Sequence, residues 1–215
     1  MPTDILQKIL IYAVPLLLAI TLHEAAHAYA AKRLGDATAY MMGRVTLNPI
    51  KHIDPLWTIV IPIITLLLTP FAFGGAKPVP VNYYNLNKPK RDMALVAAAG
   101  PAANLVMMIG WAIFMRVALS LDASEASLYF IQVGQAGIFV NAGLMVFNLF
   151  PLLPLDGGRI LVGILPNSLS IPFSRIEPYG MYILIALLFT GIINAVITPL
   201  MRMSAKFAYL LVGLG

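Results

Sequence analysis

Cysteine is absent from the 215 residues, so the chain has neither disulfide bonds nor thiolate ligands for a metal. Charged residues are also scarce: they make up 11% of the chain, whereas an ordinary soluble domain carries roughly 25%. Hydrophobic residues account for 60%, and the mean hydropathy is +0.86. These proportions exclude an ordinary soluble domain and indicate a protein that crosses a membrane several times.

Long apolar runs recur along the chain, and a helix needs about 20 apolar residues to cross roughly 30 Å of hydrocarbon. The runs cover 5–31, 56–73, 93–119, 129–155 and 178–200. Four of them predict transmembrane helices, whereas the short run 56–73, which contains two prolines, favours a re-entrant or additional hydrophobic segment. We therefore expect an all-α polytopic membrane protein with short extended segments in its connections, such as KPVPV at 77–81.

No internal repeat is visible, and no connection between the runs is long enough to form a soluble domain. The sequence predicts a single membrane-embedded domain over 1–215, with a core over 5–165 and one or two accessory C-terminal helices over 178–213. The formal net charge is +5, but the Lys and Arg residues flank the apolar runs as membrane anchors do. This distribution argues against nucleic-acid binding and for contact with the lipid bilayer.

The charges of the connections predict the orientation of the chain in the membrane. Connection 32–55 carries four basic and two acidic residues, whereas 120–128 carries two acidic residues only. The positive-inside rule places 32–55 in the cytoplasm and 120–128 on the opposite side. Connection 74–92 is also basic, so an even number of crossings is expected between it and 32–55. Segment 56–73 is too short to cross twice as a helix, which again favours a re-entrant element.

The first apolar run contains three ionisable residues, His23, Glu24 and His27, in the sequence HEAAH. On a helix, His23 and His27 lie one turn apart on the same face, where both imidazoles can bind one metal ion. In the H-E-x-x-H arrangement the glutamate is not a ligand, and it accepts a proton from water activated by the metal. The alternative is that neighbouring helices satisfy both histidines, but the cost of placing ionisable groups in an apolar span disfavours it.

A catalytic zinc site normally has three protein ligands, and the candidates for the third are His52 and a carboxylate. The extended motif with a third histidine is excluded, because Arg33 stands at its position. Among the carboxylates besides Glu24, only Asp156 ends a long apolar run, in NLFPLLPLDGG. The prolines there unwind the helix, and irregular backbone at membrane depth is tolerated where it faces protein or a polar cavity. Asp156 is alternatively an N-cap for a helix that begins near Arg159.

Two further polar residues have open interpretations. His52 is a substitute metal ligand, a substrate contact, or a structural histidine in a turn bonded to Asp54 or to the backbone. The dipeptides NP and DP on either side of it favour the structural interpretation. Asn104 lies four residues after Gly100 and is interpreted as forming a hydrogen bond between helices.

Three stretches in this order, HEAAH at 23–27, AAAGPAANL at 97–105 and NLFPLLPLDGGR at 148–159, resemble the site-2 protease family of intramembrane zinc metalloproteases. TLNPIKHIDP and AKPVPVN look like the compact prokaryotic branch of that family, without a PDZ or CBS module. The resemblance implies one zinc ion held by His23, His27 and Asp156, with Glu24 as the catalytic glutamate. It also places Asn148 beside the site, where this residue helps to hold substrate or to stabilise the oxyanion. Trp57 departs from the pattern, which usually has a small residue there.

The activity implied by this resemblance is hydrolysis of a peptide bond within or near a transmembrane segment of a membrane protein substrate. The implied location is the plasma membrane of a prokaryote, with the active site toward the cytoplasm. The alternative is a metal-coupled or proton-coupled transporter that uses the same intramembrane groups as a relay. Transport predicts inverted repeats and broken helices in both halves of the chain, and the sequence shows neither.

Overall fold

The structure, a computed structural model, describes residues 5–52, 54, 55, 60 and 77–214, and in this part of the chain it contains helices and turns but no strand. The α-helices are α1 (Ile5–Arg33), α2 (Thr38–Met41), α4 (Pro89–Ala118), α5 (Glu125–Asn148), α6 (Asp156–Ile164), α7 (Asn167–Ser174), α8 (Glu177–Phe189) and α9 (Ile192–Leu211). Two short 3-10 helices are η1 (Pro49–His52) and η3 (Tyr83–Asn85). The expected all-α architecture is confirmed for the described residues.

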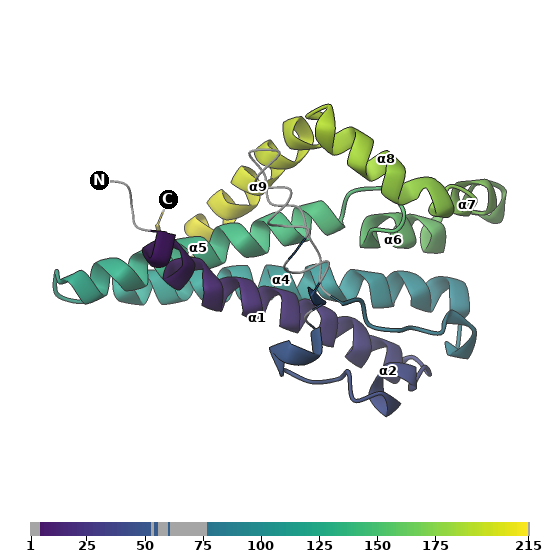
Figure 1. Cartoon of the computed structure of the whole chain (residues 1–215), viewed down its shortest axis with the longest axis horizontal. Coiled ribbons are helices and arrows are strands. Elements are labelled where there is room, and N and C mark those ends of the chain that lie inside the picture. The colour runs from purple at the N-terminus through teal and green to yellow at the C-terminus, as the bar shows by residue number, and fades with distance from the viewer. Residues whose placement is uncertain (1–4, 53, 56–59, 61–76, 215) are drawn as a thin grey trace.

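Helices α1, α4 and α5 run side by side along the length of the molecule (Figure 1). By length and composition, each of them is able to cross a membrane. They correspond to the predicted spans 5–31, 93–119 and 129–155, but α5 ends at Asn148 instead of continuing to residue 155. The helix ends there because Pro151 and Pro154 have no N–H group to extend its hydrogen bonding. The protein is therefore a multi-pass membrane protein, as its composition indicates.

Small residues allow the long helices to approach one another closely. A side chain on Gly137 of α5 would collide with the ring of Trp111 on α4. Beside this contact, one buried cluster joins α4, α5 and α9; it consists of Met108, Ala112, Ile138, Ala142, Ala205 and Ala208. Such close packing by Gly and Ala is how helices associate in lipid, where burial of apolar area drives association only weakly.

The C-terminal helices differ from the expectation of one continuous span over 178–200. Helix α8 ends at Phe189, α9 begins at Ile192, and their axes are bent by 80°. The break lies at Gly191, whose φ of 74° is in the left-handed region that glycine adopts without steric cost. The pair is therefore one broken span or a re-entrant element. Among the described residues the number of candidate spans is three, or four if the pair counts as one.

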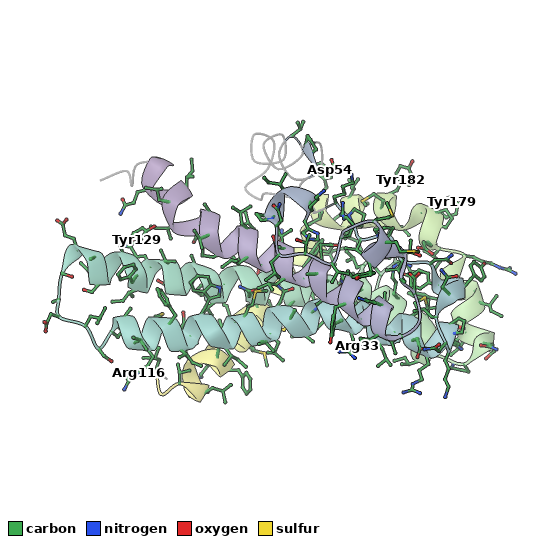
Figure 2. All side chains as sticks on the ribbon, turned by 90° about the horizontal axis from the view of Figure 1, so that it is seen from below. Arg33, Asp54, Arg116, Tyr129, Tyr179 and Tyr182 are labelled. Atoms are coloured by element: carbon green, nitrogen blue, oxygen red, sulfur yellow. The ribbon has the colours of Figure 1, made fainter. Side chains whose placement is uncertain are left out.

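The end of α1 and the start of α4 lie at the same end of the bundle. The N–H of Asn87 donates to the carbonyl oxygen of Leu34 at 2.9 Å, which joins connections 32–55 and 74–92. Figure 2 shows Arg33 and Arg116 toward opposite ends of the long helices. The connection between α4 and α5 therefore lies at the far end, as expected from the charges of the connections. Of the predicted re-entrant segment 56–73, which includes Trp57, only Val60 is among the described residues.

Candidate metal centre

His23 and His27 project from the same face of α1 and are 7% and 9% exposed. Their Nε2 atoms are 3.0 Å apart. Helix α4 approaches them at Gly100, where a β-carbon would collide with both imidazole rings. The absence of a side chain at Gly100 is therefore what allows α4 to pack against the histidine pair.

The partners of the two Nδ1 atoms determine the tautomers. The Nδ1 atom of His27 lies 2.7 Å from the carbonyl oxygen of Val96, which can only accept a hydrogen bond, so this nitrogen carries the proton. The Nδ1 atom of His23 lies 2.6 Å from Oδ1 of Asn104. The amide nitrogen of Asn104 donates to Ala19 O at 3.3 Å and to Oδ1 of Asn141 at 3.0 Å, which fixes its orientation. In the neutral rings, both Nε2 atoms therefore present lone pairs.

Asp156 directs a carboxylate at these two lone pairs. Its Oδ2 atom is 3.3 Å from Nε2 of His23 and 3.3 Å from Nε2 of His27. The same oxygen is buried and has no hydrogen-bond partner among the described residues. Helix α6 begins at Asp156 itself, and no side chain caps it, so the N-cap interpretation of this residue is wrong.

The local backbone explains how Asp156 reaches the pair. After α5 ends, the chain runs irregularly through 149–155 before α6 begins. Side chains at Gly157 and Gly158 would collide with the backbone of Leu149 and Leu152 respectively. The two glycines therefore allow the first turn of α6 to pack against the irregular stretch. This packing places the carboxylate of Asp156 beside the two histidines.

With both Nε2 atoms unprotonated, three ligand atoms of this kind, all within 4.8 Å of one another, repel each other, and a cation between them would remove this repulsion. Zinc bonds of about 2.0–2.2 Å at a tetrahedral centre separate ligand atoms by roughly 3.3–3.6 Å. The separations of 3.0 and 3.3 Å are close to that value. The two imidazoles and the carboxylate therefore fit a zinc ion and would supply three of the four ligands that it takes.

Glu24 stands outside this group of ligand atoms. It follows His23 on α1, and its Oε2 atom accepts the N–H of Val79 at 2.9 Å. Asn148 is the last residue of α5, and its amide nitrogen donates to the carbonyl oxygen of Leu144 at 2.9 Å. Each amide has two N–H groups, so Asn148 retains donor capacity beyond that bond.

The remaining polar candidates have different outcomes. His52 is fully buried, its Nε2 atom lies 3.0 Å from the carbonyl oxygen of Thr46, and it does not join the metal-ligand group of the described residues. This agrees with its interpretation as a structural histidine bonded to the backbone. Asn104 does join helices, as expected, but sequence reasoning missed that it also sets the tautomer of His23. The sequence did contain a signal for this contact. Asn104 lies four residues after Gly100, so both residues lie on the same face of α4, the face that packs against the histidines.

Replacing Gly100 by alanine is expected to lower metal affinity by roughly 10-fold to 100-fold, because the new β-carbon displaces the imidazoles. Gly110 on the same helix is the matched control, since a β-carbon there meets nothing within 4 Å. Metal content after dialysis against a graded chelator series measures the effect. Equal metal retention by Gly100→Ala and Gly110→Ala would contradict the described packing.

Buried candidate ligands between helices of membrane-spanning length define a candidate metal site inside a membrane protein. The family model for peptidase family M50 matches residues 116–191. The chain is 37% identical over 194 residues to "Putative zinc metalloprotease YwhC" of Bacillus subtilis, covering 88% of this chain and 84% of that protein. It is 28% identical over 179 residues to "Putative zinc metalloprotease Rip2" of Mycolicibacterium smegmatis, covering 83% of this chain and 66% of that protein. No solved structure matches.

The chain therefore belongs to peptidase family M50, the site-2 protease family. Membership confirms the family predicted from the three sequence stretches, and with it the expected class of intramembrane zinc metalloprotease. The transporter alternative receives no support from these comparisons.

Proposed function

We propose that this protein hydrolyses a peptide bond within or near a transmembrane segment of a membrane protein, with one zinc ion held by His23, His27 and Asp156. The observation that carries the proposal is the convergence of two imidazole nitrogens and one carboxylate oxygen that has no hydrogen-bond partner among the described residues, between helices that are able to span a membrane. A zinc ion bound there supplies a Lewis acid that lowers the pKa of water and polarises a carbonyl group.

Glu24 is the proton carrier in this proposal. Its carboxylate takes one proton from the attacking water as the oxygen bonds to the carbonyl carbon of the substrate. It then delivers that proton to the amide nitrogen as the C–N bond breaks, so the products are a carboxyl group and an amine. Asn148 donates its remaining N–H to the oxyanion that forms at the carbonyl oxygen.

The substrate segment must be locally unwound before this reaction. In a transmembrane helix each backbone carbonyl is hydrogen-bonded within the segment, and lipid offers no replacement for those bonds. A polar site buried between helices can replace those hydrogen bonds, but only if the substrate backbone is extended, because helical carbonyls are already paired. The preferred substrate is therefore a transmembrane segment whose helix is weakened near the scissile bond.

Cleavage of a purified reporter tests this function. The protein is reconstituted in liposomes with a substrate that has a single transmembrane segment, and the products are mapped by mass spectrometry. Cut sites within or at the edge of the apolar segment support the proposal. Cut sites confined to soluble loops, or no cleavage by zinc-loaded protein, would contradict it.

We further propose that the site lies toward the cytoplasmic side of a prokaryotic plasma membrane. The histidines lie in the half of α1 that leads into the basic connection 32–55, and Asn87 bonds to Leu34 at that same end. Cysteines introduced as Leu34→Cys and Lys88→Cys are expected to react with an impermeant thiol reagent from the same, cytoplasmic face of oriented vesicles. The native chain has no cysteine to interfere. Labelling from opposite faces would contradict this topology.

A further inference from the structure

We propose that Arg44 and Asp36 are positioning residues for Glu24, and that they act by holding the extended segment 77–82 so that the amide of Val79 fixes the catalytic carboxylate. This inference rests on the proposed function, since it assigns Glu24 its role. It concerns a part of the chain remote in sequence from the metal ligands. Arg44 and Asp36 come from the connection that follows α1, and segment 77–82 precedes η3.

Among the described residues, the carboxylate of Glu24 accepts a hydrogen bond from a single backbone donor. The N–H of Val79 donates to Oε2 at 2.9 Å, whereas the prolines on either side of Val79 have no N–H group. The side chain of Val79 is 9% exposed and packs with Ala28 of α1 and Ala39 of α2. Val79 is therefore both anchored by its side chain and the only donor within 78–80.

Arg44 lies at the opposite edge of the Val79 peptide group, and its short hydrogen bond is to the carbonyl oxygen of the peptide group before it. Its Nη2 atom donates to the carbonyl oxygen of Lys77 at 2.7 Å and approaches that of Pro78 at 3.5 Å. The Pro78 carbonyl and the Val79 N–H belong to one planar peptide unit and point in opposite directions. The guanidinium thus lies on one side of that unit and the carboxylate of Glu24 on the other.

Asp36 fixes the far end of the segment. Its Oδ2 atom accepts the N–H of Asn82 at 2.7 Å, and Oδ1 accepts the N–H of Thr38 at 3.0 Å and the amide of Asn85 at 3.2 Å. Burial opposes ionisation of Asp36, but these hydrogen bonds hold the pKa of its carboxyl below the ordinary value. The carboxylate is therefore charged at neutral pH and accepts all of these bonds.

The near end of the segment is held as well. The N–H of Lys77 donates to the carbonyl oxygen of His52 at 2.9 Å. Arg44, Asp36 and His52 are 7%, 0% and 0% exposed, although the connection around them exposes several large apolar side chains. Two buried polar side chains, those of Arg44 and Asp36, and the backbone carbonyl of His52 thus bind the stretch of backbone that contacts Glu24.

The functional consequence follows from the geometry of proton transfer. A glutamate side chain has three rotatable bonds, and a proton carrier must stay within hydrogen-bond reach of both water and leaving nitrogen. A displacement of about 1 Å in such a group costs roughly 100-fold in rate. Loss of the Val79 amide should therefore lower kcat while leaving the zinc ligands and substrate binding in place.

The direct test compares Val79→Pro, which removes the donor, with Val79→Ala, which shortens the same side chain but keeps the N–H. We expect Val79→Pro to lower kcat by roughly 10-fold to 100-fold, with unchanged KM and one zinc per chain, and Val79→Ala to keep a kcat well above that of Val79→Pro. Equal kcat values for the two zinc-loaded variants would overturn the proposal. If zinc-loaded wild-type protein did not cleave the reporter, the proposed function itself would be wrong. If the wild type cleaved and Glu24→Gln were inactive, equal kcat values for the two Val79 variants would refute only the positioning role.

Arg44 provides a second, independent test. Arg44→Met removes the charge and the donors and is expected to lower kcat per zinc-loaded molecule, whereas Arg44→Lys keeps one donor for the Lys77 carbonyl and is expected to recover part of it. Counting only zinc-loaded, monodisperse protein separates this effect from a loss of folding. A fall in yield with no fall in kcat per zinc, or no difference between the two variants, would show that Arg44 is merely structural.

Discussion

Glu24→Gln is expected to abolish cleavage while leaving one zinc ion bound per chain. Glutamine has nearly the same shape and can still accept the Val79 N–H through its amide oxygen, so the local structure is preserved. It cannot take a proton from water, and general acid–base catalysis contributes roughly 100-fold to 10,000-fold in rate. Cleavage of a transmembrane reporter and metal analysis of the same preparation measure both effects.

The metal analysis makes the result specific to the role of Glu24. The carboxylate is bonded to Val79 and is not among the three convergent ligand atoms, so a change in zinc content is not expected. If the well-folded variant lost zinc in proportion to its activity, Glu24 would be a ligand and the proposed division of roles would be wrong.

Asp156→Ala is expected to remove both zinc and activity. Only the two imidazoles would remain, and the negative charge that offsets the dication inside the bundle would be gone. Loss of a hydrogen bond to a metal ligand typically costs 10-fold to 100-fold in affinity, so loss of a ligand should cost at least about 100-fold. Zinc retention in competition with a chelator, measured beside reporter cleavage, gives the size of the effect.

His52→Ala is the matched control for this prediction, because His52 is the other candidate third ligand in the sequence. It is buried and contacts the carbonyl oxygen of Thr46, apart from the group formed by His23, His27 and Asp156. The variant should therefore keep its zinc even if it is less stable. Zinc that depended on His52 and survived the loss of Asp156 would reverse the choice of ligand.

The proposed metal ligands were predictable because each has a local signature. A spacing of four on a helix places His23 and His27 on one face whatever the rest of the fold does. The prolines and glycines around Asp156 mark irregular backbone at the end of an apolar run, and the structure confirms that α5 ends before them. Such features depend on the chain within about ten residues and not on distant contacts.

The partners of these residues could not be predicted in the same way. The carbonyl of Val96 and the amide of Asn104 reach the histidines only through the packing of α4 against α1. The bond from Val79 to Glu24 joins residues 55 positions apart. Nothing in the local pattern of either segment specifies such a contact, because it is decided by tertiary packing.

The break between α8 and α9 was missed for a different reason. Apolar composition over 178–200 continues through Gly191, so hydropathy predicts one span. A single glycine in a helix is often tolerated at a cost of about 1 kcal/mol, so its presence does not by itself predict a break. Here the adjacent helices pack onto the stretch before Asp156 through Leu152, Leu184 and Ile193, and that packing favours the bent arrangement.

The most direct test of the central claim is to measure cleavage as a function of zinc occupancy in one reconstituted preparation. Zinc is removed by graded chelation and restored by addition of the metal, and the reporter cleavage rate is plotted against zinc per chain at each step. The proposed site predicts that the cleavage rate rises linearly with zinc occupancy, from zero without zinc to the full rate at one zinc per chain. It also predicts that a chain carrying both His23→Ala and His27→Ala binds no zinc. Undiminished cleavage by zinc-free protein, or full zinc binding by the doubly substituted chain, would contradict it.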